Sequence, residues 1–273
     1  MNLLQGLPDK FPDPLVRYSA ETQALFESTC HEYMANLDKF PQVMAYLKSR
    51  GLSPREISEA QLGFVPPYDE RAYYLNKGRV VLPIRDSHGR YLAFAGRKFD
   101  EMADMTIRAL KQMYKSDPTF CARAVEAWEN GKWVNGRYPK KSHLYHLYEG
   151  RHEIIERGYI ILVEGYFDAL VLASRGMPNV GAVSSASITP AQIAILSRYC
   201  KRAVMLLDGD EAGDRGADRA MGLFDGTDVQ LLVVRLPGGF DPDTYVQKYS
   251  PIQLRRIFED SLEASLSDFV ITI

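Results

Sequence analysis

The sequence is poor in cysteine and lacks the short motifs that identify many metal and nucleotide sites. Its 273 residues contain three cysteines, Cys30, Cys121 and Cys200, and no CxxC pair. An odd number of widely spaced cysteines argues against a disulfide framework and favours a reducing compartment. The absence of CxxC argues against a zinc ribbon in this chain, so we expect no zinc. The GxxxxGK[ST] pattern of a P-loop is absent as well.

Long apolar runs are also absent. No stretch approaches the ~20 apolar residues that a membrane-spanning helix needs. The first 14 residues carry Asp9, Asp13 and three prolines, which is unlike a signal peptide. We therefore expect a cytoplasmic protein without a membrane partner. With 46% hydrophobic residues the chain has ample core, and its length favours two modules over one.

Charge is distributed unevenly although the net charge is only −2. Residues 71–157 contain 17 Lys and Arg against 10 Asp and Glu, whereas residues 158–273 contain 10 against 15. A basic half joined to an acidic half is typical of a surface that binds a phosphate backbone beside a metal site. Counting alone would favour ordinary solvated charge, so the placement of the acids decides.

Strand and helix patterns alternate over residues 158–248. Strands are predicted at residues 159–164, 179–183, 202–207 and 229–235, and helices at residues 166–175, 189–199 and 214–224. This alternation predicts a parallel sheet with right-handed crossovers and helices on both faces. The predicted fold class is α/β, with a smaller α+β subdomain over residues 1–157 and a helical segment over residues 249–273.

Carboxylates follow three of the four predicted strands. They are Glu164 and Asp168 after the first strand, Asp208 and Asp210 after the third, and Asp241 and Asp243 after the fourth. The carboxyl ends of parallel strands meet at one edge, so these acids converge and repel each other unless a cation neutralises them. Each acidic motif alone is better explained by cap or turn residues, and an acid at a helix N-terminus contributes only ~0.3 to 1 kcal/mol. Together they predict a site for hard divalent cations, most simply Mg²⁺.

The first half of the chain begins with helical patterns and then turns to strands. Three helices are predicted within residues 20–62, and a helical insertion without a functional signal is predicted over residues 100–135. Between them, two strand patterns around a turn predict a β-hairpin. Arg79 and Arg97 stand at its open end, where two guanidiniums side by side can grip phosphate oxygens. Solvated surface arginines are an equally common alternative.

A basic and aromatic stretch, residues 135–146, precedes the alternating region. It contains Arg137, Lys140 and Lys141 among tyrosines and histidines, a composition typical of segments that contact nucleotides or a phosphate backbone. Alone, this signal is weak.

The acidic motifs at residues 163–168, 208–213 and 241–244 resemble the Toprim signature in its bacterial, DnaG-type primase form. Segments upstream resemble the N-terminal catalytic subdomain of the same primases: residues 46–53, 62–64, 79–84, 96–97 and 144–147. The resemblance covers roughly residues 25–250. Three acidic motifs in this order after a basic module make it specific.

This resemblance implies a metal-dependent RNA polymerase that synthesises short RNA primers from nucleoside triphosphates on a single-stranded DNA template. Glu164 is then the carboxylate nearest the chemistry, as metal ligand or general base. About two or three Mg²⁺ or Mn²⁺ ions are implied. Their implied ligands are Glu164, Asp168, Asp208, Asp210, Asp241 and Asp243, and the implied phosphate and nucleic-acid contacts are Arg79, Arg97, Arg137, Lys140 and Lys141.

The sequence departs from this family pattern in two places. We expect no counterpart here of the family's zinc-binding domain or of most of its helicase-contacting domain. The resemblance therefore implies two protein partners, the replicative helicase and a zinc-binding domain in trans. The loop at residues 183–187 carries Ser185 and Ala186 where relatives usually carry Gly-Thr.

Two alternatives remain open beside the primase. One is a Toprim nuclease, in which water replaces the 3′-hydroxyl on similar metals. The other is a non-catalytic protein that binds single-stranded DNA. The upstream basic module favours the primase, because a nuclease needs no grip for an incoming triphosphate.

Overall fold

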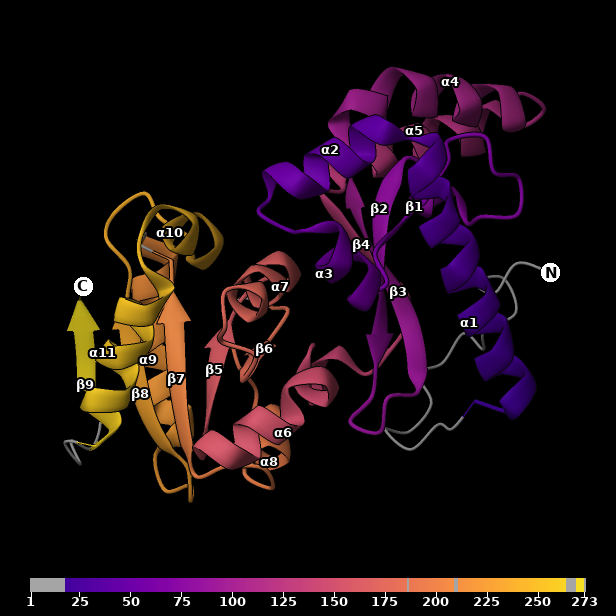
Figure 1. The fold of residues 1–273 in the computed structure, drawn as a ribbon. Coiled ribbons are helices and arrows are strands. Elements are labelled where there is room, and N and C mark those ends of the chain that lie inside the picture. Colours follow the sequence, from indigo (N-terminus) through magenta and orange to yellow (C-terminus); the bar gives the residue numbers. More distant parts are fainter. Residues whose placement is uncertain (1–17, 186, 209–210, 264–268, 273) are drawn as a thin grey trace. The chain divides into compact units, whose positions relative to one another are not determined.

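The computed structural model describes residues 18–185, 187–208, 211–263 and 269–272, without the side chains of residues 211–215 and 269–272. The chain forms two compact units (Figure 1). Residues 1–85 and 90–138 make up the first unit, and residues 86–89 and 139–273 make up the second. Within the described part of the chain, no helix is long and apolar enough to cross a membrane.

Three helices open the first unit, as predicted. They are α1 (Ala20–Ala35), α2 (Pro41–Ser49) and α3 (Pro54–Glu59). The start of α3 is fixed by a capping box: the Ser53 hydroxyl accepts from the Glu56 backbone N–H at 3.3 Å, and the Glu56 carboxylate accepts from the Ser53 N–H at 2.6 Å. Short 3₁₀ turns lie at Asn36–Lys39, Tyr74–Asn76 and Asp100–Met102.

A four-stranded antiparallel sheet, ordered β1-β2-β3-β4, forms the centre of the first unit. Its strands are β1 (Gly63–Val65), β2 (Arg79–Arg85), β3 (Tyr91–Lys98) and β4 (Trp133–Asn135). The predicted hairpin is confirmed as β2 and β3. Helix α1 packs closely on β1. The two elements are so near at Gly63 that a Cβ there would lie 2.6 Å from the backbone carbon of Tyr33.

The predicted insertion at residues 100–135 contains two helices and a strand. Helices α4 (Ala103–Met113) and α5 (Pro118–Asn130) form a helical hairpin, and β4 then returns the chain to the sheet (Figure 1). Strands β1 and β4 were not predicted, because three residues are too few for a periodic pattern and their strand character comes from pairing with β2 and β3.

The second unit contains a five-stranded parallel sheet in the order β6-β5-β7-β8-β9. Its strands are β5 (Tyr159–Val163), β6 (Val180–Ala182), β7 (Arg202–Leu207), β8 (Gln230–Arg235) and β9 (Phe269–Thr272). Its helices are α6 (Leu147–Arg157), α7 (Tyr166–Ser174), α8 (Pro190–Leu196), α9 (Glu211–Phe224), α10 (Pro242–Lys248) and α11 (Pro251–Glu263), and a 3₁₀ turn, Lys140–Ser142, precedes them. The predicted α/β class and its four strands are confirmed.

One apolar core holds this sheet together. Buried Ile160, Leu162, Met205 and Val233 from three neighbouring strands belong to a single cluster with residues of α6, α8 and α9. Strands buried on both faces carry continuous apolar runs rather than alternating ones, which is why their positions were predictable.

The structure differs from the predicted domain limits at both ends of this unit. Helix α6 belongs to the second unit, although the prediction assigned residues 1–157 to the first subdomain. The predicted helical segment at residues 249–273 contains α11 but also β9, which pairs in parallel with β8. The C-terminal segment therefore completes the sheet.

Candidate active site

The parallel sheet brings the predicted acids to its carboxyl edge. Glu164 directly follows β5, and Asp208 directly follows β7, its neighbour in the sheet. Asp168 lies in the first turn of α7, while Asp241 caps α10 and Asp243 lies in its first turn. Helices α7 and α10 pack against each other (Figure 1), which joins the acids after β5 to those after β8.

Asp168 is the electrostatic centre of this acidic group. Burial raises the pKa of its carboxyl group, and the carboxylates of Asp241, Asp208 and Asp243 raise it further, to about 7. A hydrogen bond from the Gly165 backbone N–H to Asp168 Oδ2, 3.0 Å long, opposes this shift without cancelling it. Four carboxyl groups from three parts of the chain thus lie within electrostatic reach of one another.

The two acids of α10 have different surroundings. Asp241 accepts hydrogen bonds from the Thr244 backbone N–H at 2.8 Å and from the Thr244 hydroxyl at 2.6 Å, as an N-cap residue does. Asp243 has no exposed surface and accepts a hydrogen bond from the Gln247 side-chain amide. Asp243 is therefore the least accessible of the predicted metal ligands that the structure describes.

Because Gly165 has no side chain, the Asp168 carboxylate fits directly against its backbone. A Cβ at residue 165 would lie 2.4 Å from Asp168 Oδ2, closer than any side chain tolerates. The backbone of Gly165 is extended, with φ −101° and ψ 156°. A side chain at residue 165 would therefore displace the Asp168 carboxylate, whereas the extended backbone alone does not require glycine.

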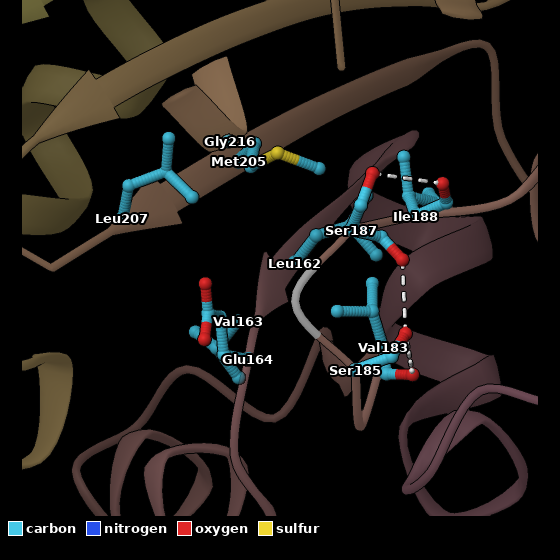
Figure 2. Close-up of a pocket in the computed structure, with 10 residues that line it drawn as sticks. All are labelled: Leu162, Val163, Glu164, Val183, Ser185, Ser187, Ile188, Met205, Leu207 and Gly216. Atoms are coloured by element: carbon cyan, nitrogen blue, oxygen red, sulfur yellow. Dashed lines mark hydrogen bonds between the residues drawn. The ribbon is translucent and has the colours of Figure 1, made fainter. Parts of the chain in front are cut away.

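Glu164 lines a narrow pocket at the same edge of the sheet. Figure 2 shows Glu164 and Val163 on one side and Ser185 and Ser187, from the loop after β6, on the other. Apolar side chains that include Leu162, Val183, Ile188, Met205 and Leu207 complete its walls. The backbone carbonyl of Glu164 accepts a hydrogen bond from the Ser184 N–H at 3.0 Å, which fixes the loop beside it.

Sequence reasoning missed Gln192, which ties the segments around this pocket together. Its side chain is fully buried, and its Nε2 donates to the carbonyls of His143 at 2.7 Å and Val183 at 3.0 Å. Its Oε1 accepts from the Thr189 backbone N–H at 2.9 Å. The only available sequence signal was the Thr189-to-Gln192 capping-box spacing, which indicates a helix start and not a positioning role.

No complete metal-binding constellation is formed among the described residues: no three His, Cys, Asp or Glu side chains there are already arranged around one point. Asp210, a predicted ligand, lies outside the described residues, and so does Ala186 of the loop after β6. The acids are gathered by the fold, and their coordination of a metal stays a prediction.

The structure contradicts the prediction that Arg79 and Arg97 hold a phosphate side by side. Arg79 pairs with Lys98 across the hairpin, and Val80 pairs with Arg97. Because successive residues of a strand point to opposite faces, the two arginines lie on opposite faces of the sheet.

Arg79 is moreover a structural residue of the first unit. Its side chain has no exposed surface, and its guanidinium donates to the backbone carbonyls of Leu75, Lys132 at 3.2 Å and Trp128 at 3.3 Å. The guanidinium also lies over the Trp128 ring, 5.6 Å from its centroid. These contacts join β2, α5 and the start of β4.

We expect Arg79→Met to lower the free energy of unfolding by about 2 kcal/mol, because three hydrogen bonds of the buried guanidinium to backbone carbonyls are lost. Urea denaturation of the whole chain measures this loss. Arg97→Met is the matched control: Arg97 is partly exposed, over the Trp133 ring at 5.7 Å, and its loss should cost less than about 1 kcal/mol. Equal stability of the two variants would contradict the structural role of Arg79.

The other predicted basic contacts keep accessible side chains. Arg137 is exposed in the first unit, and Lys141 is exposed in the second. Lys140 is partly buried, and burial lowers the pKa of its ammonium group. The Gln192 side chain also donates to the Lys140 carbonyl at 3.4 Å. Their contact with phosphates stays a prediction.

Comparison with known proteins identifies the relatives of this chain. A Toprim-like family model matches residues 161–246, the region that carries the acids. The chain is 30% identical to the DNA primase of Aquifex aeolicus in a match that covers 87% of this chain and 48% of that protein. It is 29% identical to the DNA primase of Haemophilus influenzae in a match that covers 93% of this chain and 46% of that protein.

Solved structures agree with this relationship. The zinc-binding and RNA polymerase domains of the Aquifex aeolicus primase match with a TM-score of 0.72 and 28% identity, over 89% of this chain and 62% of that one. This chain is a relative of the DnaG-type primase core. A DnaG catalytic core matches with a TM-score of 0.67 and 26% identity, over 87% of this chain and 79% of that one.

A DnaG primase catalytic domain bound to single-stranded DNA also matches, with a TM-score of 0.67 and 25% identity, over 87% of this chain and 78% of that one. The chain spans about half the length of the curated DnaG-type primases that it matches. The relationship therefore concerns the catalytic core of these primases.

Proposed function

We propose that this chain is a nucleotidyltransferase that synthesises short RNA primers from nucleoside triphosphates on a single-stranded DNA template, as the polymerase core of a DNA primase. The observation that carries the proposal is the convergence of Asp208, Asp241 and Asp243 on Asp168 at the carboxyl edge of the Toprim sheet. The named DNA primases that match most of the chain support it.

The residues present fit a hard divalent cation. All donors are carboxylate oxygens, the ligand type that Mg²⁺ prefers. Burial, and after it the neighbouring carboxylates, raise the pKa of Asp168 to about 7, and a bound ion would offset the cost of this buried negative charge. When bound, about two or three Mg²⁺ or Mn²⁺ ions would lower the pKa of the primer 3′-hydroxyl, polarise the α-phosphate and stabilise the departing pyrophosphate.

The chain's own residues would accept a proton, hold the ions and contact the phosphates. Glu164, which lines the pocket at this edge of the sheet, would accept the proton of the 3′-hydroxyl or hold an ion. Asp208, Asp210, Asp168, Asp241 and Asp243 would hold the ions. Arg97, Arg137, Lys140 and Lys141 would contact the triphosphate and nucleic-acid backbones and add positive charge where negative charge accumulates. Arg79 is not included, because its side chain is buried and its guanidinium donates to backbone carbonyls.

The proposed partners follow from this role. The template is single-stranded DNA, consistent with the related DnaG catalytic domain that is solved with single-stranded DNA. The replicative helicase and a zinc-binding domain are the proposed protein partners, as the resemblance to DnaG-type primases implies.

Incubation of the chain with single-stranded template, Mg²⁺ or Mn²⁺ and labelled ribonucleotides tests the proposal. Template-dependent oligoribonucleotides are the expected product. Shortening of the template would instead identify a nuclease, and retention of template without chemistry would identify a binding protein. Either result overturns the primase proposal.

Gly165→Ala is expected to reduce primer synthesis by roughly 10-fold to 100-fold, because the new Cβ displaces the Asp168 carboxylate and misplaced catalytic groups cost rates of this order. Initial rates of ribonucleotide incorporation measure the effect. Gly222→Ala is the matched control, since a Cβ there meets nothing within 4 Å. Unchanged synthesis by Gly165→Ala would show that the position of Asp168 is unimportant.

A further inference from the structure

The helical hairpin of the first unit, α4 and α5, has no part in the proposed primer synthesis. Its inner side is anchored: Trp128 is buried, and its indole N–H donates to the Lys77 carbonyl at 2.6 Å. Near the connection between the helices, the Tyr114 and Phe120 rings pack edge to face with centroids 4.8 Å apart, and Tyr74 packs against both. The hairpin is therefore held firmly against its unit.

Helix α5 carries a second apolar stripe that no described element covers. Pro118, Cys121, Ala122 and Val125 follow the spacing i, i+3, i+4, i+7 of one helix face, while Ala124 and Trp128 fill the buried face. With the end of α4, this stripe lines an open groove of about 480 Å³. Small side chains on the stripe allow another helix to approach closely.

The charges along this groove are separated by sign. Lys111 and Lys115 line it near the connection between α4 and α5, whereas Glu126 and Glu129 line it farther along α5. At a rise of 1.5 Å per residue, these glutamates lie roughly 12 to 17 Å beyond Pro118. Within the described part of the chain, none of the four side chains makes an ion pair or a side-chain hydrogen bond.

We propose that this groove is the contact surface of a homodimer, in which two hairpins pack antiparallel about a twofold axis. A twofold axis across α5 places the basic end of one groove against the acidic end of the other, so the surface is complementary to itself. The apolar stripe would supply most of the affinity, and the ion pairs would fix orientation, because exposed pairs stabilise little. The proposal is independent of the catalytic function.

The test is the oligomeric state of the full chain. A contact of this small size is expected to be weak, with a dissociation constant of roughly micromolar or higher. Sedimentation equilibrium over a range of concentrations should therefore show a monomer–dimer equilibrium. The Lys111→Glu/Lys115→Glu and Glu126→Lys/Glu129→Lys variants should each raise the dissociation constant at least about 10-fold, since like charges then face each other.

An equimolar mixture of the two charge-reversed variants should restore dimers, because opposite charges face each other again. Arg108→Glu/Arg123→Glu is the matched control: both arginines are exposed on the same helices but do not line the groove, and dimerisation should be unchanged. A monomer at every concentration, or a dimer indifferent to both reversals, would overturn the proposal.

Cross-linking through Cys121 is a second test of the dimer, because it also reports how the two chains are arranged. Cys30 and Cys200 are buried, whereas Cys121 is partly exposed in the groove. A short bis-maleimide should therefore cross-link two wild-type chains through Cys121, fail with either charge-reversed variant, and succeed with their mixture. Efficient cross-linking of a single charge-reversed variant would contradict the antiparallel arrangement.

Discussion

Primer synthesis by Glu164→Gln and by Asp208→Ala is expected to fall by at least about 100-fold, with the fold intact. Loss of one preorganised electrostatic group in an active site typically costs ~100-fold to 1,000-fold in rate. Both residues lie at strand ends on the carboxyl edge of the sheet, outside its apolar core, so the thermal unfolding temperature should change little. Initial rates of labelled ribonucleotide incorporation on single-stranded template measure the loss.

Asp228→Asn is the matched control for these variants. Asp228 is an exposed acid that precedes β8, at the opposite edge of the sheet, and pairs only loosely with Lys201 at 3.5 Å. Its replacement should leave synthesis within about 2-fold of wild type. Full activity of Glu164→Gln or of Asp208→Ala would remove that residue from the proposed chemistry.

Asp168→Asn is expected to stabilise the metal-free protein by roughly 4 kcal/mol at pH 8 while impairing synthesis. The pKa of Asp168 rises from its ordinary value of 3.8 to about 7 in the folded protein. Each pKa unit corresponds to about 1.4 kcal/mol, so the ionised carboxylate costs the fold an amount of this order. Asparagine keeps an acceptor for the Gly165 N–H without the charge.

The sign of the pH dependence follows from the raised pKa. The folded state binds the Asp168 proton more tightly than the unfolded state does, so wild-type stability falls as the pH rises from the ordinary pKa of 3.8 to the folded value of about 7. The asparagine variant does not titrate there. The two proteins should thus unfold alike at acidic pH and diverge towards pH 8, as thermal denaturation in the presence of a chelator would show.

Added Mn²⁺ provides the control for this interpretation. A cation that neutralises the acids should stabilise the wild type more than Asp168→Asn, because the variant has less charge to relieve. A variant that is no more stable than wild type at pH 8 in chelator would contradict the electrostatic account of the site.

Sequence patterns predicted the parallel sheet well because its strands are buried on both faces. Continuous apolar runs such as Tyr159–Val163 and Arg202–Leu207 leave little ambiguity, and the acids that follow them were placed at the correct edge by topology alone. The short strands β1, β4 and β9 were missed. Their residues form strands because neighbours pair with them, and a single sequence carries no record of those neighbours.

Individual side chains were harder to predict than elements. The β-hairpin that carries Arg79 and Arg97 was predicted correctly. In its register, however, Arg79 pairs with Lys98 and not with Arg97, so the two arginine side chains lie on opposite faces of the sheet. The burial of Arg79 depends on Trp128, nearly 50 residues away along the chain. Gln192 was equally invisible, because one of its hydrogen-bond partners, the His143 carbonyl, lies 49 residues away along the chain.

Crystals of the protein soaked in Mn²⁺ would test the central claim most directly, by anomalous scattering from the bound ions. The account predicts Mn²⁺ at the carboxyl edge of the sheet, within about 2.0 to 2.3 Å of Asp208 and of at least one carboxylate oxygen from Glu164, Asp168 or Asp241. An empty edge at saturating Mn²⁺, or ions bound only elsewhere, would contradict it.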